Sequence, residues 1–221
     1  LATIAAACAA HGVRPGHLIE LGPGFGTFAA LARDSGAFER VSVVERTPEM
    51  AAACRRHGLV VHETAVEDLP ERFDDPADVL VCFEVIEHVY DPVPFLARAL
   101  RLLKTGGLLV LTCPNGNGFD TQVLGAESVA VDTEHVNLFN PASIARLLER
   151  LDCEVLAVAT PGRLDVELVR EAVQAGRCDV SGQPFLQQLL VTDHARLAAP
   201  FQQFLADHGL SGNLRAIARK R

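Results

Sequence analysis

The sequence predicts an α/β fold, a doubly wound and mostly parallel β-sheet with helices on both faces. Short apolar runs alternate along the chain with stretches of helical periodicity. The first run, residues 18–21, leads at once into Gly22, Gly24 and Gly26, a pattern typical of a strand that turns tightly into a helix. Strands that alternate with helices at this spacing form parallel sheets with a helical layer on each side.

The expected elements follow in chain order through the first half. Thr47 and Pro48 are expected to cap the third helix, because threonine supplies a cap oxygen and proline suits a first turn. Gly106 and Gly107 are expected to form the turn into the fifth strand. The expected strands and helices are helix 4–11, strand 18–21, helix 28–34, strand 41–45, helix 50–57, strand 59–62, strand 77–83, helix 94–103 and strand 108–113.

The last third of the chain departs from this regular alternation. A helix over 141–150, capped by Asn140, and a sixth strand over 153–160 continue the pattern. Helical periodicity then returns in three segments before residues 213–218 alternate as a strand does. We therefore expect a single domain over residues 1–221, with a helical insertion over 161–212 whose helices are 166–175, 184–190 and 194–208.

The composition limits the classes of protein to consider. A hydrophobic content of 49% supports a large core, and a formal charge of −8 without clustered Lys or Arg argues against a nucleic-acid surface. No run is long enough to span a bilayer, and the apolar residues 1–10 lack a basic start. The cysteines show no metal-binding or paired spacing, which favours reduced core thiols and a cytoplasmic location; they are Cys8, Cys54, Cys82, Cys113, Cys153 and Cys178.

The glycine-rich stretch predicts a site for a nucleotide-like cofactor. Its glycines leave bare backbone and the amides of the next helix open to a ligand. The spacing is G-x-G-x-G, whereas the dinucleotide fingerprint has its third glycine one place later, where Thr27 stands. Glu45 ends the next apolar run, where a carboxylate can accept both hydroxyls of an adenosine ribose. The spacing alone does not choose between cofactors.

Three segments taken together identify a family: E-L-G-P-G-F-G at 20–26, V-V-E at 43–45, and E-V-I-E-H-V at 84–89 with Asp91-Pro92. This series resembles class I S-adenosylmethionine-dependent methyltransferases, in the branch similar to the ubiquinone-biosynthesis O-methyltransferases and to sugar and small-molecule methyltransferases. The resemblance covers roughly residues 15–160 and the last strand. It implies a Rossmann-like methyltransferase fold, a seven-stranded sheet with an antiparallel last strand.

The resemblance also implies S-adenosyl-L-methionine as cofactor, with S-adenosyl-L-homocysteine as product. Glu20 either holds the loop amides or orients the cationic methionine end of the cofactor, and we adopt the second role. The family commonly has an aspartate where Ala65 stands, which leaves the adenine to backbone groups or to Glu67. The expected cofactor-binding residues are Glu20, Gly22, Pro23, Gly24, Gly26, Glu45, Arg46, Val66, Glu67, Phe83, Glu84 and Val85.

Glu84, Glu87 and His88 follow the fourth strand at i, i+3 and i+4, so in a helical turn they would share a face toward the cofactor's sulfonium. His88 is then a general base for an acceptor hydroxyl, because imidazole titrates near neutral pH. Alternatively the three side chains hold a divalent metal such as magnesium. We adopt the base interpretation and predict no metal site. His135 is a second candidate base, and Asn137 is either its hydrogen-bond partner or a loop anchor.

The predicted function is methyl transfer from S-adenosyl-L-methionine to a small-molecule or saccharide acceptor, at oxygen. His88, Glu87 and His135 are the predicted catalytic residues. The loop over 116–131 is expected to be a long irregular cover for the acceptor. Two alternatives stay open: a nicotinamide-dependent oxidoreductase, which the glycines and Glu45 alone permit, and a cofactor-binding scaffold without turnover. The expected partner is the small-molecule or glycan acceptor, with no nucleic acid and no membrane span.

Overall fold

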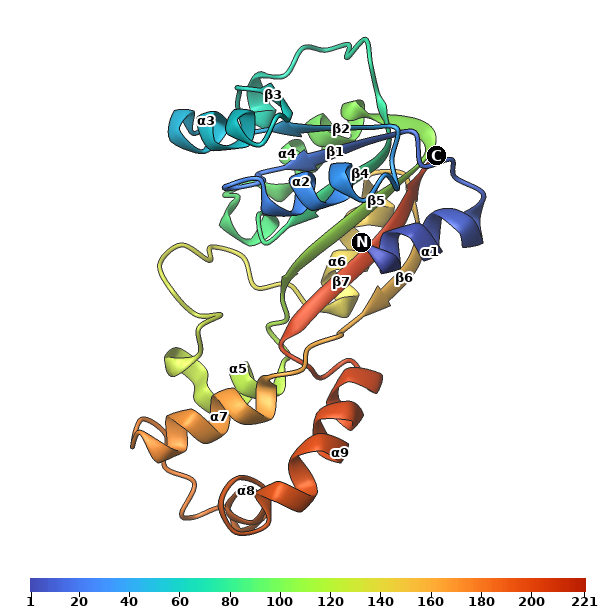
Figure 1. Cartoon of the computed structure of the whole chain (residues 1–221). Coiled ribbons are helices and arrows are strands. Elements are labelled where there is room, and N and C mark those ends of the chain that lie inside the picture. Colours follow the sequence, from blue (N-terminus) through green and yellow to red (C-terminus); the bar gives the residue numbers. More distant parts are fainter.

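A computed structural model describes residues 1–221 and shows a seven-stranded sheet in the order β3-β2-β1-β4-β5-β7-β6 (Figure 1). Neighbouring strands are parallel from β3 across to β5, and β7 runs antiparallel to both β5 and β6. The predicted fold class is confirmed. The strands are β1 His17–Leu21, β2 Arg40–Val44, β3 Val60–His62, β4 Ala77–Phe83, β5 Leu103–Pro114, β6 Cys153–Ala159 and β7 Asn213–Lys220.

Helices cover both faces of the sheet because successive side chains of a strand point to opposite faces. Leu18 packs in a cluster with α1 (Ala2–His11), α2 (Thr27–Asp34) and α3 (Pro48–Arg56). Its neighbour Ile19 packs on the other face with α4 (Pro92–Ala99) and α6 (Pro141–Arg150). The central strands therefore carry apolar side chains on both faces, and β1 is buried along its whole length.

The chain after β6 forms a helical lobe at the carboxyl end of β5 (Figure 1). It consists of α7 (Asp165–Gln174), α8 (Pro184–Gln187), a π-helical turn (Gln188–Thr192) and α9 (His194–Asp207). These helices have a separate apolar core built around Val169, Leu189 and Leu190. The helices expected between residues 161 and 212 thus form, and they enclose apolar surface of their own.

Three local expectations are wrong. The segment 116–131 is not irregular, because it contains α5 (Phe119–Leu124), whose Phe119 packs edge to face on Phe201 of α9 at 5.3 Å between ring centroids. Strand β5 starts at Leu103 and carries Gly106 and Gly107 inside it, with a register shift against β4. The Thr47 side chain makes no cap hydrogen bond. The cap at Asn140 is confirmed, with a full capping box.

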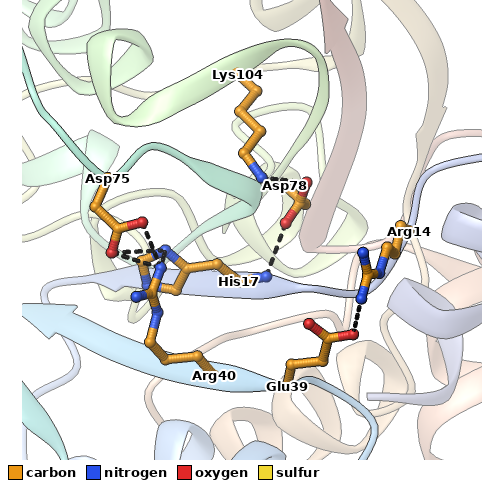
Figure 2. A network of polar contacts seen from close by, with 7 residues as sticks. All are labelled: Arg14, His17, Glu39, Arg40, Asp75, Asp78 and Lys104. Carbon is orange, nitrogen blue, oxygen red and sulfur yellow. Dashed lines mark hydrogen bonds and ion pairs between the residues drawn. The ribbon is translucent and has the colours of Figure 1, made fainter.

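The amino ends of the strands carry a cluster of charged side chains (Figure 2). Asp78 accepts hydrogen bonds from the His17 backbone N–H at 2.8 Å and from Lys104 Nζ at 2.7 Å. Arg40 pairs with Asp75 at 2.5 Å, and Arg14 pairs with Glu39. Each charge in this cluster has a partner of opposite charge. Among the helices, none combines the length and the apolar character needed to cross a bilayer.

Candidate active site

The glycine loop between β1 and α2 contains three left-handed residues, with φ of 60° at Gly22, 55° at Gly24 and 80° at Gly26. Two of them are required by packing as well. A Cβ at Gly22 would stand 2.8 Å from Val85 Cγ2, and one at Gly26 would stand 2.9 Å from Cys54 Sγ. A Cβ at Gly24 would meet no atom within 4 Å. The middle of the loop is therefore bare backbone that faces open space, as a ligand cradle requires.

A cavity of about 450 Å³ lies beside this loop, at the carboxyl ends of β1, β2 and β4. Ligands of open α/β sheets bind at this edge. Of the predicted cofactor-binding residues, Gly22, Glu45, Arg46, Val66, Glu67 and Val85 line the cavity. His88 lines it too. The lining residues that the sequence did not indicate are Leu21, Val44, Thr64, Val89, Tyr90 and Phe95, while Ala65 had been placed near the adenine.

Glu45 stands in this wall as a ribose ligand would. Its side chain is buried, and Oε1 accepts a hydrogen bond of 2.7 Å from the Thr47 backbone N–H. This bond fixes the position of the carboxylate. The other oxygen has no protein partner, so it is free to accept from a ligand hydroxyl.

Glu20 lies beneath the loop rather than in the cavity wall. It is 4% exposed, and Oε2 has no hydrogen-bond partner. Burial raises the pKa of this carboxyl to about 7, against a lowering effect of the Ala29 backbone N–H. An orphaned buried carboxylate costs free energy unless a donor reaches it. The open glycine, the free oxygen of Glu45 and this orphan together fit a ribose-bearing cofactor with a cationic end.

Four other predicted cofactor residues lie outside the cavity wall. Pro23, Gly24 and Gly26 belong to the loop beside it, and Phe83 packs edge to face on Phe28 with ring centroids 4.9 Å apart. Loop and packing positions shape such a cavity without lining it. Their predicted part in cofactor binding remains a prediction.

Glu84 departs from its expected place. The helical face shared with Glu87 and His88 does not form, because Glu84 takes a left-handed φ of 51° and precedes the 3₁₀ turn Ile86–His88. Its Oε1 accepts hydrogen bonds from Thr112 Oγ1 at 2.5 Å and from Asn213 Nδ2 at 3.2 Å. The side chain therefore points away from the cofactor cavity and lines a second one. Such backbone strain concentrates at functional sites.

Glu87, His88 and His135 come together instead, with donor atoms within 4.8 Å of one another. The two imidazole rings lie 4.7 Å apart, His88 in the wall of the first cavity and His135 in the wall of the second. Glu87 is 1% exposed, and neither of its carboxylate oxygens has a partner. Burial, more than the nearby Glu84, raises its pKa to about 7.

Both histidines have a defined tautomer. The Nδ1 of His88 lies 3.1 Å from the Glu134 carbonyl, and the Nδ1 of His135 lies 3.1 Å from the Ala130 carbonyl. Because a carbonyl can only accept, each neutral ring carries its proton on Nδ1 and keeps the lone pair on Nε2. Asn137 does not bond to His135; its side chain donates to the Val89 carbonyl at 2.6 Å and anchors the loop.

The second cavity, of about 350 Å³, lies between the sheet edge and the helical lobe. Its wall combines residues from the ends of β4, β5 and β7 with residues from α5, α7 and the loop before α6. Lining residues include Glu84, Asp120, His135, Arg163, Asp165 and Asn213. The walls of the two cavities come together where Glu84 precedes Val85 in the chain and where the ring of His88 lies 4.7 Å from that of His135. A donor in one cavity and an acceptor in the other would thus lie on either side of the histidine pair.

The strand order with its antiparallel β7, and a glycine loop and acid at the carboxyl edge, define the Rossmann-like methyltransferase class. The chain belongs to the methyltransferase family described as "Methyltransferase domain", whose model matches residues 1–158. The predicted membership of the class I S-adenosylmethionine-dependent methyltransferases is confirmed, and with it the enzyme class and the cofactor. The nicotinamide-dependent oxidoreductase is not supported.

The chain is similar to the ubiquinone biosynthesis O-methyltransferase of Xanthomonas oryzae, at 30% identity over 151 residues, which is 62% of each protein. It is 32% identical to that of Xylella fastidiosa over 120 residues, or 51% of this chain and 48% of the relative. The aligned region thus spans less than two thirds of these relatives. A methyltransferase structure from Archaeoglobus fulgidus superposes with a TM-score of 0.62 at 17% identity, covering 99% of this chain and 94% of that one.

Another S-adenosylmethionine-dependent methyltransferase, from Mesorhizobium loti, has a TM-score of 0.60 at 16% identity and covers 97% of this chain and 96% of that one. At this level of identity the likeness establishes the fold. Both structures are matched over nearly the whole of this chain, whereas the family model ends at residue 158. The helical lobe therefore lies outside the part of the sequence that defines the family.

Proposed function

We propose that this chain transfers the methyl group of S-adenosyl-L-methionine to a hydroxyl oxygen of a small molecule, and that the acceptor is a saccharide or a similarly hydroxylated compound. One observation carries the proposal: the walls of two cavities come together at His88 and His135, beside the buried and unpartnered Glu87. The first cavity has the features of a cofactor site. The second opens toward the lobe and would hold the acceptor.

In this proposal the cofactor's ribose is held by the free oxygen of Glu45, and its methionine end lies along Gly24 above Glu20. The adenine lies against Val66 and Glu67, where the missing aspartate at Ala65 leaves backbone groups to contact it. The orphaned oxygen of Glu20 is near enough to the loop to respond to a cation placed there. These assignments use the groups that the protein itself leaves unpaired.

When bound, the cofactor supplies a methyl group on a positively charged sulfur, which is electrophilic without acid catalysis. The protein's contribution is to position the acceptor and to remove its proton. As the acceptor oxygen takes the methyl group, its proton passes to the Nε2 of His88, where the lone pair lies. Glu87, ionised beside the resulting imidazolium, stabilises that charge.

A metal-assisted version of the reaction remains as the alternative. Its ligands would be Glu87, His88 and His135, so His135 takes the place of Glu84 in the set expected from the sequence. The two versions differ in their response to a chelator. A general base is indifferent to EDTA, whereas a metal-dependent enzyme stops and recovers when magnesium is restored. We adopt the base version because the lone pair on Nε2 of His88 can accept the proton of an acceptor hydroxyl directly.

The preference for oxygen is supported by the relatives' names, since the Xanthomonas and Xylella proteins are O-methyltransferases of ubiquinone biosynthesis. The preference for a hydroxylated acceptor is supported by the second cavity, whose wall includes carboxylates and an amide that can accept or donate to hydroxyl groups. We also propose a cytoplasmic location, which the six free thiols favour.

The test is methyl transfer from labelled cofactor to hydroxylated small molecules and nucleotide sugars, together with thermal shift by S-adenosylhomocysteine and by NAD. A ligand that binds only the native state raises the melting temperature by mass action. We expect a shift with S-adenosylhomocysteine, no shift with NAD, and labelled product from a hydroxylated acceptor. Binding without turnover on every acceptor would make the chain a scaffold. A shift with NAD alone would overturn the proposal.

A further inference from the structure

We propose that the acceptor carries an ammonium group in addition to the methylated hydroxyl, and that this group binds to Asp120 and Asp165 in the second cavity. The inference rests on the proposed function only in placing the acceptor in that cavity. The class of acceptor is then an amino sugar or another hydroxylated amine. The family model does not cover the whole of this site, because α7 and Asp165 lie beyond residue 158, where the matched part of the chain ends.

The first observation is an unpaired carboxylate in the cavity wall. Asp120 is 4% exposed, and its Oδ1 has no hydrogen-bond partner. It lines the second cavity together with Asp165, which is 3% exposed. A buried carboxylate oxygen without a donor is costly, so the cavity offers a site that a ligand N–H or O–H group would satisfy.

The second observation is that the neighbouring carboxylate is held in place by donors of the protein. Asp165 accepts hydrogen bonds from the Ser211 hydroxyl at 2.5 Å, from the Gly212 backbone N–H and from Gln202. These bonds tie α7 to the residues that enter β7. Asp165 therefore has a structural role of its own, and it keeps Asp120 beside a negative charge.

A purely structural role for Asp120 is the competing explanation. Burial and then the charge of Asp165 raise the pKa of the Asp120 carboxyl, which in the protonated form would donate to Asp165. Asparagine, however, would donate there at every pH without any burial of charge. The chain has instead an acid, whose ionised form is useful only when a cation reaches it. This difference between Asp and Asn gives the test.

The charges around the cavity favour a cation over a neutral hydroxyl. Glu84, Asp120 and Asp165 are acidic, and Arg163, the one fixed positive charge in the wall, is exposed to solvent. His135 is the remaining titratable group. A buried ammonium needs paired carboxylates, and a pair of acids offers two. At the other end of the cavity His135 adjoins His88, where the hydroxyl would be methylated.

Glycines let the backbone pack closely against the pair. A Cβ at Gly212 would overlap Asp120 Oδ1, and one at Gly118 would stand 2.9 Å from the same atom. Both residues come from the chain segments that join the lobe to β5 and β7. The lobe is thus set against the sheet so that two carboxyl groups remain together in the cavity wall, rather than being separated or covered by side chains.

The experiment compares pairs of acceptors that differ in whether they carry an amino group: glucosamine with glucose, and 2-amino-1,3-propanediol with glycerol. Each is tested by transfer from labelled cofactor and by calorimetric binding to the protein saturated with S-adenosylhomocysteine. We expect the amine of at least one pair to be favoured by about tenfold or more, the effect of one charge-assisted contact.

The deciding variant is Asp120→Asn, with Asp179→Asn, an exposed acid of the same lobe, as matched control. We expect Asp120→Asn to keep its melting temperature and its affinity for S-adenosylhomocysteine, and to lose the amine preference. The control should change none of these. An Asp120→Asn variant that keeps the preference would overturn the inference, as would a wild type that neither binds nor methylates either amine better than its neutral partner.

The same measurements separate failure of this inference from failure of the proposed function. If the wild type does not bind S-adenosylhomocysteine, the proposed function itself is wrong. If the wild type binds S-adenosylhomocysteine but methylates neutral acceptors as efficiently as the matched amines, the proposed function stands and the ammonium site is wrong. If the Asp120→Asn variant does not fold, Asp120→Ser is used in its place. This change also removes the charge and leaves a hydroxyl donor for Asp165.

Discussion

The two edges of the sheet hold polar groups in opposite ways. At the amino edge His17, Arg40, Asp75, Asp78 and Lys104 form a network in which each charge meets a partner (Figure 2). At the carboxyl edge, buried carboxylate oxygens of three residues have no partner at all: Glu20, Glu87 and Asp120. Paired charges hold a structure together, whereas a buried carboxylate oxygen without a partner can be satisfied by a donor that a ligand brings.

Burial shifts the pKa values of titratable groups in opposite directions at the two edges. At the amino edge burial, with help from Arg40, lowers the pKa of His17 to about 4, so the ring is neutral and donates or accepts with Ser42 Oγ at 2.8 Å. At the carboxyl edge burial raises the pKa of both Glu20 and Glu87 to about 7. At the amino edge the fold keeps the His17 ring in its neutral form. At the carboxyl edge the ionised forms of Glu20 and Glu87 are favoured only when a cation lies nearby.

The largest expected effect is on turnover at the carboxyl edge. His88→Ala should lower turnover by about 100-fold or more, because the proton acceptor is removed from the junction of the cavities. Affinity for S-adenosylhomocysteine should stay within about threefold, since His88 forms only part of the first cavity's wall. Steady-state kinetics and calorimetry measure the two quantities. Near-normal turnover in both His88→Ala and Glu87→Ala would leave His135 as the candidate base.

The second effect concerns how the free energy of unfolding depends on pH. His17 at the amino edge and Glu20 at the carboxyl edge should contribute slopes of opposite sign. Between pH 4 and 6.5 the unfolded chain protonates His17 and the folded chain does not, so stability falls as pH falls. Between pH 4.5 and 7 the folded chain keeps the Glu20 proton that the unfolded chain releases, so stability falls as pH rises. Each shift corresponds to about 3 kcal/mol.

Denaturant unfolding of two variants separates these contributions. His17→Gln should reduce the loss of stability that occurs as the pH falls. Glu20→Gln should reduce the loss of stability that occurs as the pH rises, but only in part, because Glu87 titrates over the same range. S-adenosylhomocysteine, whose amino group is cationic, should restore stability at pH 8 in the wild type more than in Glu20→Gln. Identical profiles for both variants and the wild type would show that the two edges do not differ in this way.

The third effect concerns affinity for the cofactor. Glu45→Ala should weaken S-adenosylhomocysteine binding by about 10- to 150-fold, which corresponds to about 1.5–3 kcal/mol for charge-assisted hydrogen bonds to a ribose. Glu39→Ala is the control, because Glu39 precedes the same strand at the amino edge and its ion pair with Arg14 is exposed. Calorimetry that finds equal affinities for the two variants would remove Glu45 from the site.

The sequence predicted the fold well because apolar runs and glycines act locally. Glu45 and Val85 were predicted at the cavity because each follows directly from a strand end. Tyr90 and Phe95 were missed, since their places depend on how α4 returns over the sheet. Glu84 was misplaced because its left-handed φ turns the side chain away, and residue type alone does not indicate such a backbone for glutamate.

Pairs that are distant in the sequence were the hardest to predict. His88 and His135 were both candidate bases, but only the packing of the segment before α6 against the 3₁₀ turn brings their rings together. Asp120 and Asp165 were not predicted as site residues, because α5 was expected to be an irregular loop and α7 part of a helical insertion. A site built from the lobe therefore requires the tertiary structure.

The smallest effect tests whether the bare glycine backbone serves a ligand or only a turn. Gly24→Ala and Gly36→Ala both place a methyl group at a left-handed residue where no atom lies within 4 Å, with φ of 55° and 66°. Both should lose about 1–2 kcal/mol of stability, from the same backbone strain. Only Gly24→Ala should also weaken S-adenosylhomocysteine binding, by about tenfold, because its methyl group stands in the space of the ligand. Since the strain is matched, any difference in affinity between the two variants reports the cradle itself, and equal affinities would make Gly24 a turn residue like Gly36.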